Sequence, residues 1–144
     1  MSRTVVDLDG SIVKLNLSRG ITRASGRNTR SKYHIAARQL IKECFPTLQV
    51  CEEITIPLKK GHTVYLDFFL PLNNKCIEVH GEQHYKFIPH FHQTMMGFAK
   101  HKQRDREKQE WCELNDIEYI ELPYNEDIEQ WKRRILNDEY NKDL

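Results

Sequence analysis

The order of strand and helix patterns in this sequence predicts an α/β fold. More closely, it predicts an α+β arrangement in which helices flank a mixed sheet. Three strand patterns follow a first helix, and the connections between them are so short that these strands must pair antiparallel. A long helical pattern then precedes a fourth strand, and its length suits a crossover connection. The chain has 144 residues, which is enough for one hydrophobic core but too few for two ordinary domains.

Composition excludes several classes of protein. Hydrophobic residues make up 39% and charged residues 30% of the chain, as in a globular protein and unlike a disordered, collagen-like or coiled-coil one. No stretch reaches the roughly 18 apolar residues of a membrane span, and the first ten residues lack the apolar core of a signal peptide. We therefore expect a soluble protein without a membrane partner, located in the cytoplasm, or in the host-cell cytoplasm if a phage encodes it.

Residues 1–30 are predicted to form a basic hairpin and arm. Residues 4–17 carry apolar residues on both sides of Asp9-Gly10, which suits a two-residue turn, and residues 18–30 have the composition of a flexible linker. Residues 1–32 carry a net charge of +5, which leaves −4 for the rest of the chain. A basic arm suits a polyanion, and a merely solubilising tail is the alternative. The candidates for DNA binding are Arg19, Arg23, Arg27, Arg30 and Lys32.

Residues 31–144 are expected to form a single domain. Its first helix begins near Ser31, a residue type that caps helices, and ends at Phe45-Pro46 because proline disfavours helix in the residue before it. Alternating and β-branched residues then predict three strands. These strands are residues 50–58, 63–72 and 75–81.

The second half of the domain is predicted to contain helix, strand and helix. Residues 94–115 form the long helix, with Asp105 on its inward face and Lys108 on another face; a salt-bridged, fully solvated helix is the alternative. Residues 117–122 form the fourth strand, and an amphipathic helix follows from Glu126.

Two acidic residues, Asp67 and Glu78, lie inside apolar strand patterns. A buried carboxylate is costly unless a cation or a metal compensates it. Two carboxylates on neighbouring strands can converge on one hard cation such as Mg²⁺, which prefers oxygen ligands. The alternative is that both side chains point outward. Strand alternation predicts that Asp67 and Phe69 share one face, and that Leu66 and Phe68 share the other.

Two histidines follow the second acidic residue. His80 comes two residues after Glu78 and is therefore expected on the same strand face, and His84 lies just beyond it. Imidazole titrates near neutrality, so it can take a proton from water or give one to a leaving oxygen. One histidine alone is more often structural, but two beside a carboxylate pair point to function.

Zinc is not expected. The four cysteines are scattered without a CxxC pair, so we expect them to be reduced thiols. His90, His92 and His101 have a spacing that zinc would accept, but no cysteine lies nearby to complete a four-ligand structural site.

The order of these motifs resembles the PD-(D/E)XK nuclease superfamily, with its restriction-endonuclease-like core of order α-β-β-β-α-β-α. The residues that carry the resemblance are Asp67, then EVHGEQHY, and then the stretch from Lys100 to Pro123 that contains QRDREK. More narrowly, they are similar to the very-short-patch-repair-like endonucleases and the phage homing endonucleases of the EDxHD type. The resemblance covers about residues 31–124.

The resemblance implies a role for each matching residue. Asp67 resembles the principal metal-binding aspartate, Glu78 is its second acidic ligand, and Val79 completes the expected metal set. His80 stands where the wider superfamily has a lysine. His84 resembles the general base.

Asp105 resembles the helical aspartate that orients this base. Lys100, Lys102 and Arg104 of the same helix are added to the candidates for DNA binding.

Some residues depart from the family pattern. His34 stands where the first helix usually supplies a glutamate, which leaves a second metal ion in doubt, and Glu82 replaces the cysteine that binds zinc in the repair enzymes. The spacing from His80 to His84 is one residue shorter than in those enzymes, so the role of base could fall to His80. His34 and Gln83 stay open as site residues.

The function that the resemblance implies is hydrolysis of phosphodiester bonds in double-stranded DNA. We expect a Mg²⁺-dependent endonuclease in which Mn²⁺ can substitute, in the form of a free-standing phage-type homing endonuclease acting as a monomer or a homodimer. One alternative is a repair or structure-specific nuclease for mismatched or branched DNA. The other is a non-catalytic nucleic-acid-binding module on the same fold.

Overall fold

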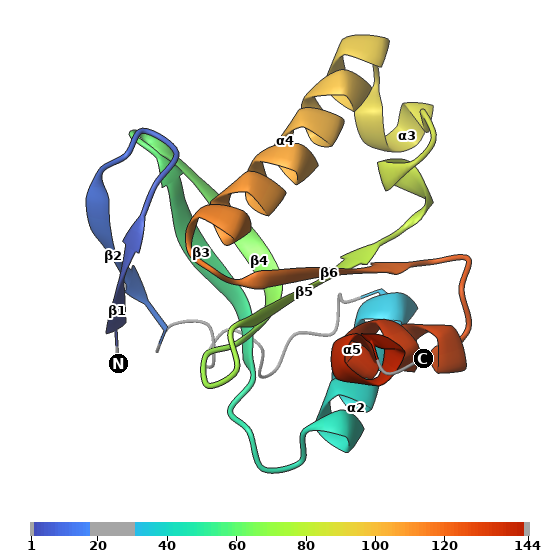
Figure 1. The fold of residues 1–144 in the computed structure, drawn as a ribbon. Helices are drawn as coiled ribbons and strands as arrows, with labels where there is room; N and C mark the ends of the chain where they lie inside the picture. The colour runs from blue at the N-terminus through green and yellow to red at the C-terminus, as the bar shows by residue number, and fades with distance from the viewer. Residues whose placement is uncertain (1, 18–30, 143–144) are drawn as a thin grey trace.

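Four strands form the central sheet of the computed structural model, which describes residues 2–17 and 31–142 (Figure 1). In spatial order they are β3 (Cys51–Lys59), β4 (His62–Leu70), β5 (Lys75–His80) and β6 (Glu118–Pro123). Strands β3, β4 and β5 pair antiparallel, and β6 runs parallel to β5. The mixed sheet and its antiparallel meander, which the strand spacing predicts, are confirmed.

Two helices, α2 (Lys32–Cys44) and α5 (Ile128–Lys142), cover one face of this sheet (Figure 1). Ser31 begins α2 by accepting a hydrogen bond of 3.1 Å from the backbone N–H of His34, and the helix ends before Pro46, as expected. The core between these helices and the sheet contains Ala37, Leu40, Ile41, Phe68, Leu70, Ile77, Ile120, Leu122, Trp131 and Ile135.

The long helix α4 (Met95–Leu114) packs on the opposite face. The hydroxyl of Thr94 caps its start by accepting a hydrogen bond of 3.0 Å from the N–H of Gly97. Near its other end Trp111 and Cys112 are fully buried in a second core. Among the helices of the described residues, none has the length and apolar character to cross a bilayer.

A hairpin of β1 (Ser2–Val6) and β2 (Ile12–Asn16) shares this second core through the buried side chains of Val5, Leu15 and Leu17. The hairpin is confirmed, but its predicted two-residue turn is wrong because residues 7–11 connect the strands. The carboxylate of Asp7 accepts hydrogen bonds from the N–H groups of Asp9 and Ser11, at 3.0 and 2.9 Å. The N–H of Asp7 also donates to the carbonyl of Ser11 at 3.0 Å, so the backbone pairing extends one step beyond the two strands and residues 8–10 form the turn, with Gly10 at a φ of +85°.

The regular alternation predicted for β4 fails at Asp67. Leu66 and Phe69 belong to the core beneath α4, whereas Phe68 belongs to the core on the other face. On the neighbouring strand β3, Glu53 interrupts the ladder opposite Asp67 with a φ of +49°. Leu66 and Phe68, which are two residues apart and were expected on one face, therefore lie on opposite faces, because of a local irregularity that period-two reasoning could not foresee.

Two short helical segments connect β5 to α4. They are the 3₁₀ turn η1 (Glu82–His84) and the single-turn helix α3 (Pro89–His92). Neither was predicted, because segments of three or four residues are too short to show a helical period.

Asn115 joins the hairpin to the end of α4, and this contact yields a prediction of stability. Its side-chain oxygen accepts from the N–H of Val6 at 2.8 Å, and its amide donates to the carbonyls of Val6 and Trp111, both at 2.9 Å. We expect Asn115→Ala to lower the free energy of unfolding in urea by about 1–3 kcal/mol, the cost of leaving partly buried polar groups unpaired. Asn125→Ala, at an exposed position, is the matched control. Equal stability of the two variants would contradict this role.

Candidate active site

Asp67 and Glu78 meet where β4 and β5 diverge. The antiparallel ladder between these strands ends at the pair Phe68–Ile77. Asp67 and Glu78 occupy the next pair of opposed positions, just beyond the end of the ladder. Beyond that pair, Glu78 Oε2 accepts from the N–H of Asp67 at 2.5 Å, and Asp67 Oδ2 accepts from the N–H of Val79 at 2.8 Å. Each carboxylate therefore satisfies a backbone donor of the opposite strand, and the three expected metal-site residues lie together.

A lysine from α4 balances part of the charge of this pair. Lys108 Nζ lies 2.8 Å from Glu78 Oε1, and both side chains are largely buried. Burial and the charge of Glu78 raise the pKa of Asp67 to about 7, although the hydrogen bond from Val79 and the charge of Lys108 oppose the shift. Burial disfavours the charged amine, but the two carboxylates still raise the pKa of Lys108 above its usual value. The site thus carries two acids against one buried cation.

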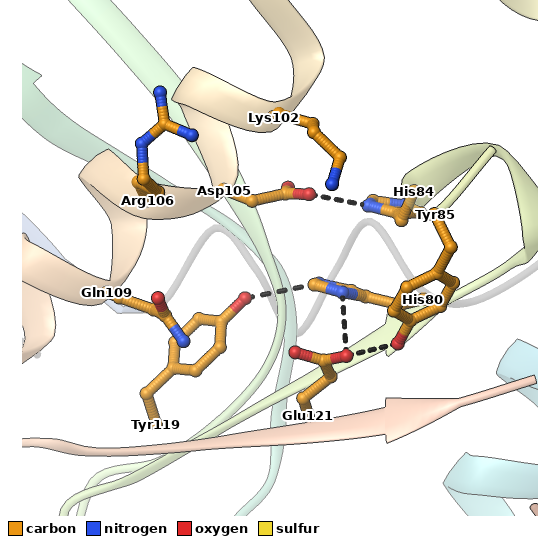
Figure 2. Close-up of a pocket in the computed structure, with 9 residues that line it drawn as sticks. All are labelled: His80, His84, Tyr85, Lys102, Asp105, Arg106, Gln109, Tyr119 and Glu121. Carbon is orange, nitrogen blue, oxygen red and sulfur yellow. Dashed lines mark hydrogen bonds and ion pairs between the residues drawn. The ribbon is translucent and has the colours of Figure 1, made fainter. Parts of the chain in front are cut away.

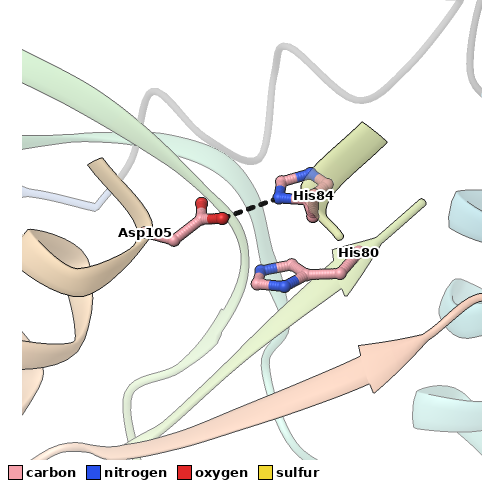
Figure 3. Close-up of side chains that lie close together, drawn as sticks. All are labelled: His80, His84 and Asp105. Carbon is pink, nitrogen blue, oxygen red and sulfur yellow. Dashed lines mark hydrogen bonds and ion pairs between the residues drawn. The ribbon is translucent and has the colours of Figure 1, made fainter. Parts of the chain in front are cut away.

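His84 and Asp105 form a second pair beside the first. His84 Nδ1 lies 2.9 Å from Asp105 Oδ2 (Figure 3). Burial would raise the pKa of Asp105, but its hydrogen bond to His84 and the nearby positive groups lower it. An ionised carboxylate can only accept, so Nδ1 of His84 carries the proton of this hydrogen bond.

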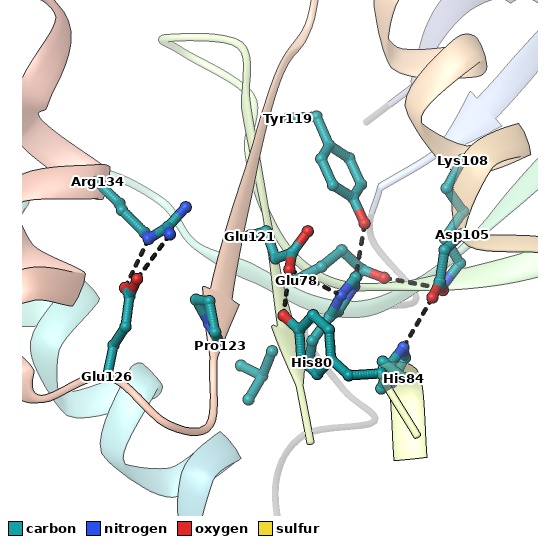
Figure 4. Close-up of polar contacts among 12 residues, drawn as sticks. Glu78, His80, His84, Asp105, Lys108, Tyr119, Glu121, Pro123, Glu126 and Arg134 are labelled. Carbon is teal, nitrogen blue, oxygen red and sulfur yellow. Dashed lines mark hydrogen bonds and ion pairs between the residues drawn. The ribbon is translucent and has the colours of Figure 1, made fainter. Parts of the chain in front are cut away.

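His80 lies beneath His84 and is held by β6. Its Nε2 lies 3.1 Å from the hydroxyl of Tyr119, and its Nδ1 lies 3.6 Å from Glu121 Oε2 (Figures 2 and 4). Burial would lower the pKa of His80, but the contact with Glu121 and the charges of neighbouring acids raise it. The contact with His80 in turn lowers the pKa of Glu121 to about 2, and the hydroxyl of Tyr85 also donates to this carboxylate.

Two openings give access to these groups, and His84 borders both. The first is an open groove of about 530 Å³, bordered by Asp67, Glu78, Val79, Gln83, His84, Arg104 and Lys108 among others. The second is a smaller pocket of about 170 Å³ above His80, His84, Asp105 and Glu121 (Figure 2). A ligand in the groove could therefore contact the carboxylate pair and His84 at the same time.

The carboxylate pair fits a hard divalent cation better than the imidazoles fit any metal. Carboxylate oxygens are the ligands that Mg²⁺ prefers, and the excess negative charge of Asp67 and Glu78 over Lys108 would favour a cation. His80, His84 and Asp105 also place three ligand atoms within 4.8 Å of one another. However, the two rings are parallel at 7°, so their in-plane nitrogen lone pairs run side by side and do not converge on one ion.

Other expected site residues lie elsewhere. His34 is buried on the face covered by α2, where its Nε2 lies 2.9 Å from Glu52 Oε1 and its ring stacks on Phe68. Lys32, at the start of α2, places Nζ 5.1 Å from the centre of the Tyr33 ring. Neither lines the groove or the pocket described above.

The candidates for DNA binding on α4 lie close to the site. Lys100, Lys102 and Arg104 are exposed, Lys102 borders the smaller pocket and Arg104 borders the groove. The four arginine candidates of the arm, Arg19, Arg23, Arg27 and Arg30, lie outside the described residues.

Sequence reasoning missed four residues of this network: Lys108, Tyr85, Tyr119 and Glu121. The expectation that Lys108 lies on a different face of α4 from Asp105 is wrong. The two residues are three apart, so their side chains are neighbours on a helix, and the charge of Glu78 draws the long lysine chain inward. Alternation in the strand 117–122 could have placed Tyr119 and Glu121 on one face, but it could not show which residues they face.

Comparison with known proteins gives viral relatives. The chain is similar to "Uncharacterized protein 307L" of Invertebrate iridescent virus 6, with 41% identity over 59 residues that make up 41% of this chain and 30% of that protein. It is also similar to "Uncharacterized protein 033L" of Invertebrate iridescent virus 3, with 27% identity over 105 residues (72% and 54% of the two chains). "Uncharacterized protein 094L" of Frog virus 3 is 33% identical over 78 residues (53% and 50%).

The chain therefore spans about half or less of the length of these viral relatives. No family model and no solved structure matches it.

The raised pKa of Asp67 predicts a dependence of stability on pH. Its pKa is about 7 in the folded protein and near 3.8 in an unfolded chain, so the folded state binds more protons and its free energy of unfolding falls as the pH rises from about 4 to about 7. We expect Asp67→Asn to remove this loss, so that the variant gains on the order of 1–4 kcal/mol over the wild type between pH 4 and pH 8.

Urea unfolding with EDTA present, at pH 4, 6 and 8, measures the effect. Asp116→Asn, at an exposed position, is the control and should gain nothing. A constant difference between Asp67→Asn and the wild type across this range would show that Asp67 titrates normally in the folded protein.

Proposed function

We propose that this protein is a metal-dependent endonuclease that hydrolyses phosphodiester bonds in double-stranded DNA. The observation that carries the proposal is that the Asp67–Glu78 pair and His84, whose Nδ1 lies 2.9 Å from Asp105, border one groove. Hydrolysis of a phosphodiester needs both a site for a hard cation and a base near the attacking water. The motif order that resembles the PD-(D/E)XK nucleases supports the same assignment.

Asp67 and Glu78 are the residues that would hold the cation, with Val79 beside them in the groove. A bound Mg²⁺ or Mn²⁺ ion would polarise the phosphate and acidify a coordinated water. Lys108, whose Nζ lies 2.8 Å from Glu78 Oε1 in this structure, would supply a positive charge beside the phosphate.

His84 is the residue that we assign as general base. Asp105 holds its Nδ1 proton, which leaves Nε2 to accept a proton from water. His80 is the weaker candidate because both of its ring nitrogens already have partners on β6. The geometry therefore favours His84, although its spacing from His80 differs by one residue from the repair enzymes.

DNA is the substrate that the charge distribution supports. Residues 85–104, which run from the 3₁₀ turn into α4, contain no Asp or Glu, and they contain Lys86, Lys100, Lys102 and Arg104. This segment places a positive surface next to the groove, and positive surfaces supply most of the affinity for phosphate backbones.

A free-standing homing endonuclease is the narrower form of the proposal, and it rests on the resemblance to the EDxHD type. The matched relatives come from viruses, which supports a virus-encoded enzyme that acts inside the infected cell. Incubation with Mg²⁺ and a library of viral genomic DNA, followed by sequencing of the new ends, tests it. Recurrent ends at one sequence support the homing form, and preferred cutting of mismatched or branched DNA supports a repair or structure-specific nuclease.

Asp67→Asn provides the direct test of metal-dependent catalysis. The amide keeps the shape of the side chain but lacks the charge that holds a hard cation, so we expect cleavage in Mg²⁺ or Mn²⁺ to be abolished while DNA binding is retained. The stability measurements above show whether the variant is folded. Cleavage at nearly the wild-type rate would remove Asp67 from the site and, with it, the proposed mechanism.

His84→Ala tests the assignment of the base. Loss of a positioned base should lower the single-turnover rate constant by about 10²–10⁴. The residual rate should then rise more steeply with pH than in the wild type between pH 6 and 9, because hydroxide replaces the missing base. His90→Ala, at an exposed position of α3, is a control that keeps the wild-type pH profile. Full activity of His84→Ala, with the steep pH rise seen in His80→Ala, would assign the base to His80.

A further inference from the structure

The imidazole rings of His80 and His84 are stacked face to face. Their centroids are 4.1 Å apart and the planes differ by 7° (Figure 3). Stacking at this distance fixes the plane of one ring relative to the other. His80 comes from the end of β5 and is 5% exposed, whereas His84 comes from the 3₁₀ turn and its side chain is 20% exposed. The rigid ring therefore lies beneath the accessible one.

The ring nitrogens of His80 are both directed at β6 and away from the groove. Nε2 meets the hydroxyl of Tyr119 at 3.1 Å, and Nδ1 lies 3.6 Å from the carboxylate of Glu121. Strand β6 can reach them because it runs parallel to β5, with Glu121 paired to Glu78 and Pro123 paired to His80. Both nitrogens of His80 thus already have partners on β6, a hydroxyl group and a carboxylate.

Glu121 also holds the chain segment that carries His84. The same carboxylate oxygen that lies near His80 accepts a hydrogen bond from the hydroxyl of Tyr85, the residue directly after His84 (Figure 2). One side chain on β6 thus fixes the ring beneath His84 and the residue beside it. The carboxylate of Asp105 completes the arrangement from α4.

We propose that His80 is a stacking platform, and that His80, Glu121 and Tyr119 are positioning residues that fix the ring plane of His84. The platform holds His84 so that Nδ1 meets Asp105 while Nε2 turns toward the groove. This inference rests on the proposed role of His84 as the base. It assigns His80 a role that depends on the flat shape of its ring. A role as proton donor or phosphate ligand would instead require its nitrogens.

The test compares His80→Phe with His80→Ala. Phenylalanine keeps a flat ring for stacking and removes both nitrogens, whereas alanine removes both the ring and the nitrogens. We expect His80→Phe to retain a single-turnover rate within about tenfold of the wild type, and His80→Ala to lose about 10²-fold, the usual effect of a misplaced catalytic group. Both losses should appear in the rate at saturating DNA and leave the binding affinity unchanged. A His80→Phe variant that is folded but as inactive as His80→Ala would overturn the proposal.

Tyr119→Phe is a second variant, and it removes only a hydroxyl group. We expect it to lower the rate at saturating DNA by about three- to tenfold without a change in affinity. Tyr33→Phe, on the opposite face of the sheet, is the matched control and should have no effect. A wild-type rate for Tyr119→Phe would contradict the positioning role of β6 even if His80→Phe failed to fold.

Ring nitrogen signals of His84 separate this inference from the proposed function. In ¹⁵N-labelled protein, we expect His84 to be a single Nδ1–H tautomer in the wild type and in His80→Phe, and a mixture of tautomers with broadened signals in His80→Ala. These signals need no substrate. If the wild type cleaves no DNA, the nuclease proposal fails, but these signals still test whether His80 positions the ring of His84. An unchanged Nδ1–H tautomer in His80→Ala would refute the positioning role.

Discussion

Two carboxylates that face each other where β4 and β5 diverge are the constraint on which the rest of the site depends. Asp67 and Glu78 lie just beyond the last ladder pair of the two strands. Each carboxylate accepts a hydrogen bond from the backbone of the other strand. Like charges this close are unfavourable in a buried setting, so a cation must approach them. Lys108 is that cation in the described residues, and its 2.8 Å contact with Glu78 ties α4 to the fork of the sheet.

The position of α4 then determines which other side chains meet. Trp111 and Cys112 are buried in the core beneath the helix and fix its rotation. Because Asp105 and Lys108 are three residues apart, the rotation that brings Lys108 to Glu78 also brings Asp105 to the site, where it meets His84. One helix therefore supplies a core contact, a counter-charge and a histidine partner, and a change at any one of them would disturb the others.

The two histidines show how neighbouring residues of one type can acquire different surroundings. His80 is buried on β5, and the parallel strand β6 supplies partners for both of its nitrogens. His84 lies on a short turn at the junction of the groove and the smaller pocket, with one nitrogen directed to Asp105. Exposure and the supply of partners, rather than the residue type, separate a ring that can act on a substrate from a ring that can only support it.

The sequence by itself determined the α/β class, the order of the elements and the strands that carry Asp67, Glu78 and His80, because these follow from local periodicity, turn residues and proline. It also selected His84 and Asp105, through a motif order that resembles a nuclease superfamily. Only the tertiary structure decided that Lys108 turns inward, that Tyr119 and Glu121 hold His80, and that His34 pairs with Glu52 on the other face. These contacts join residues 18 to 41 positions apart, and local periodicity gives a side chain's face but not the partner that another element brings to it.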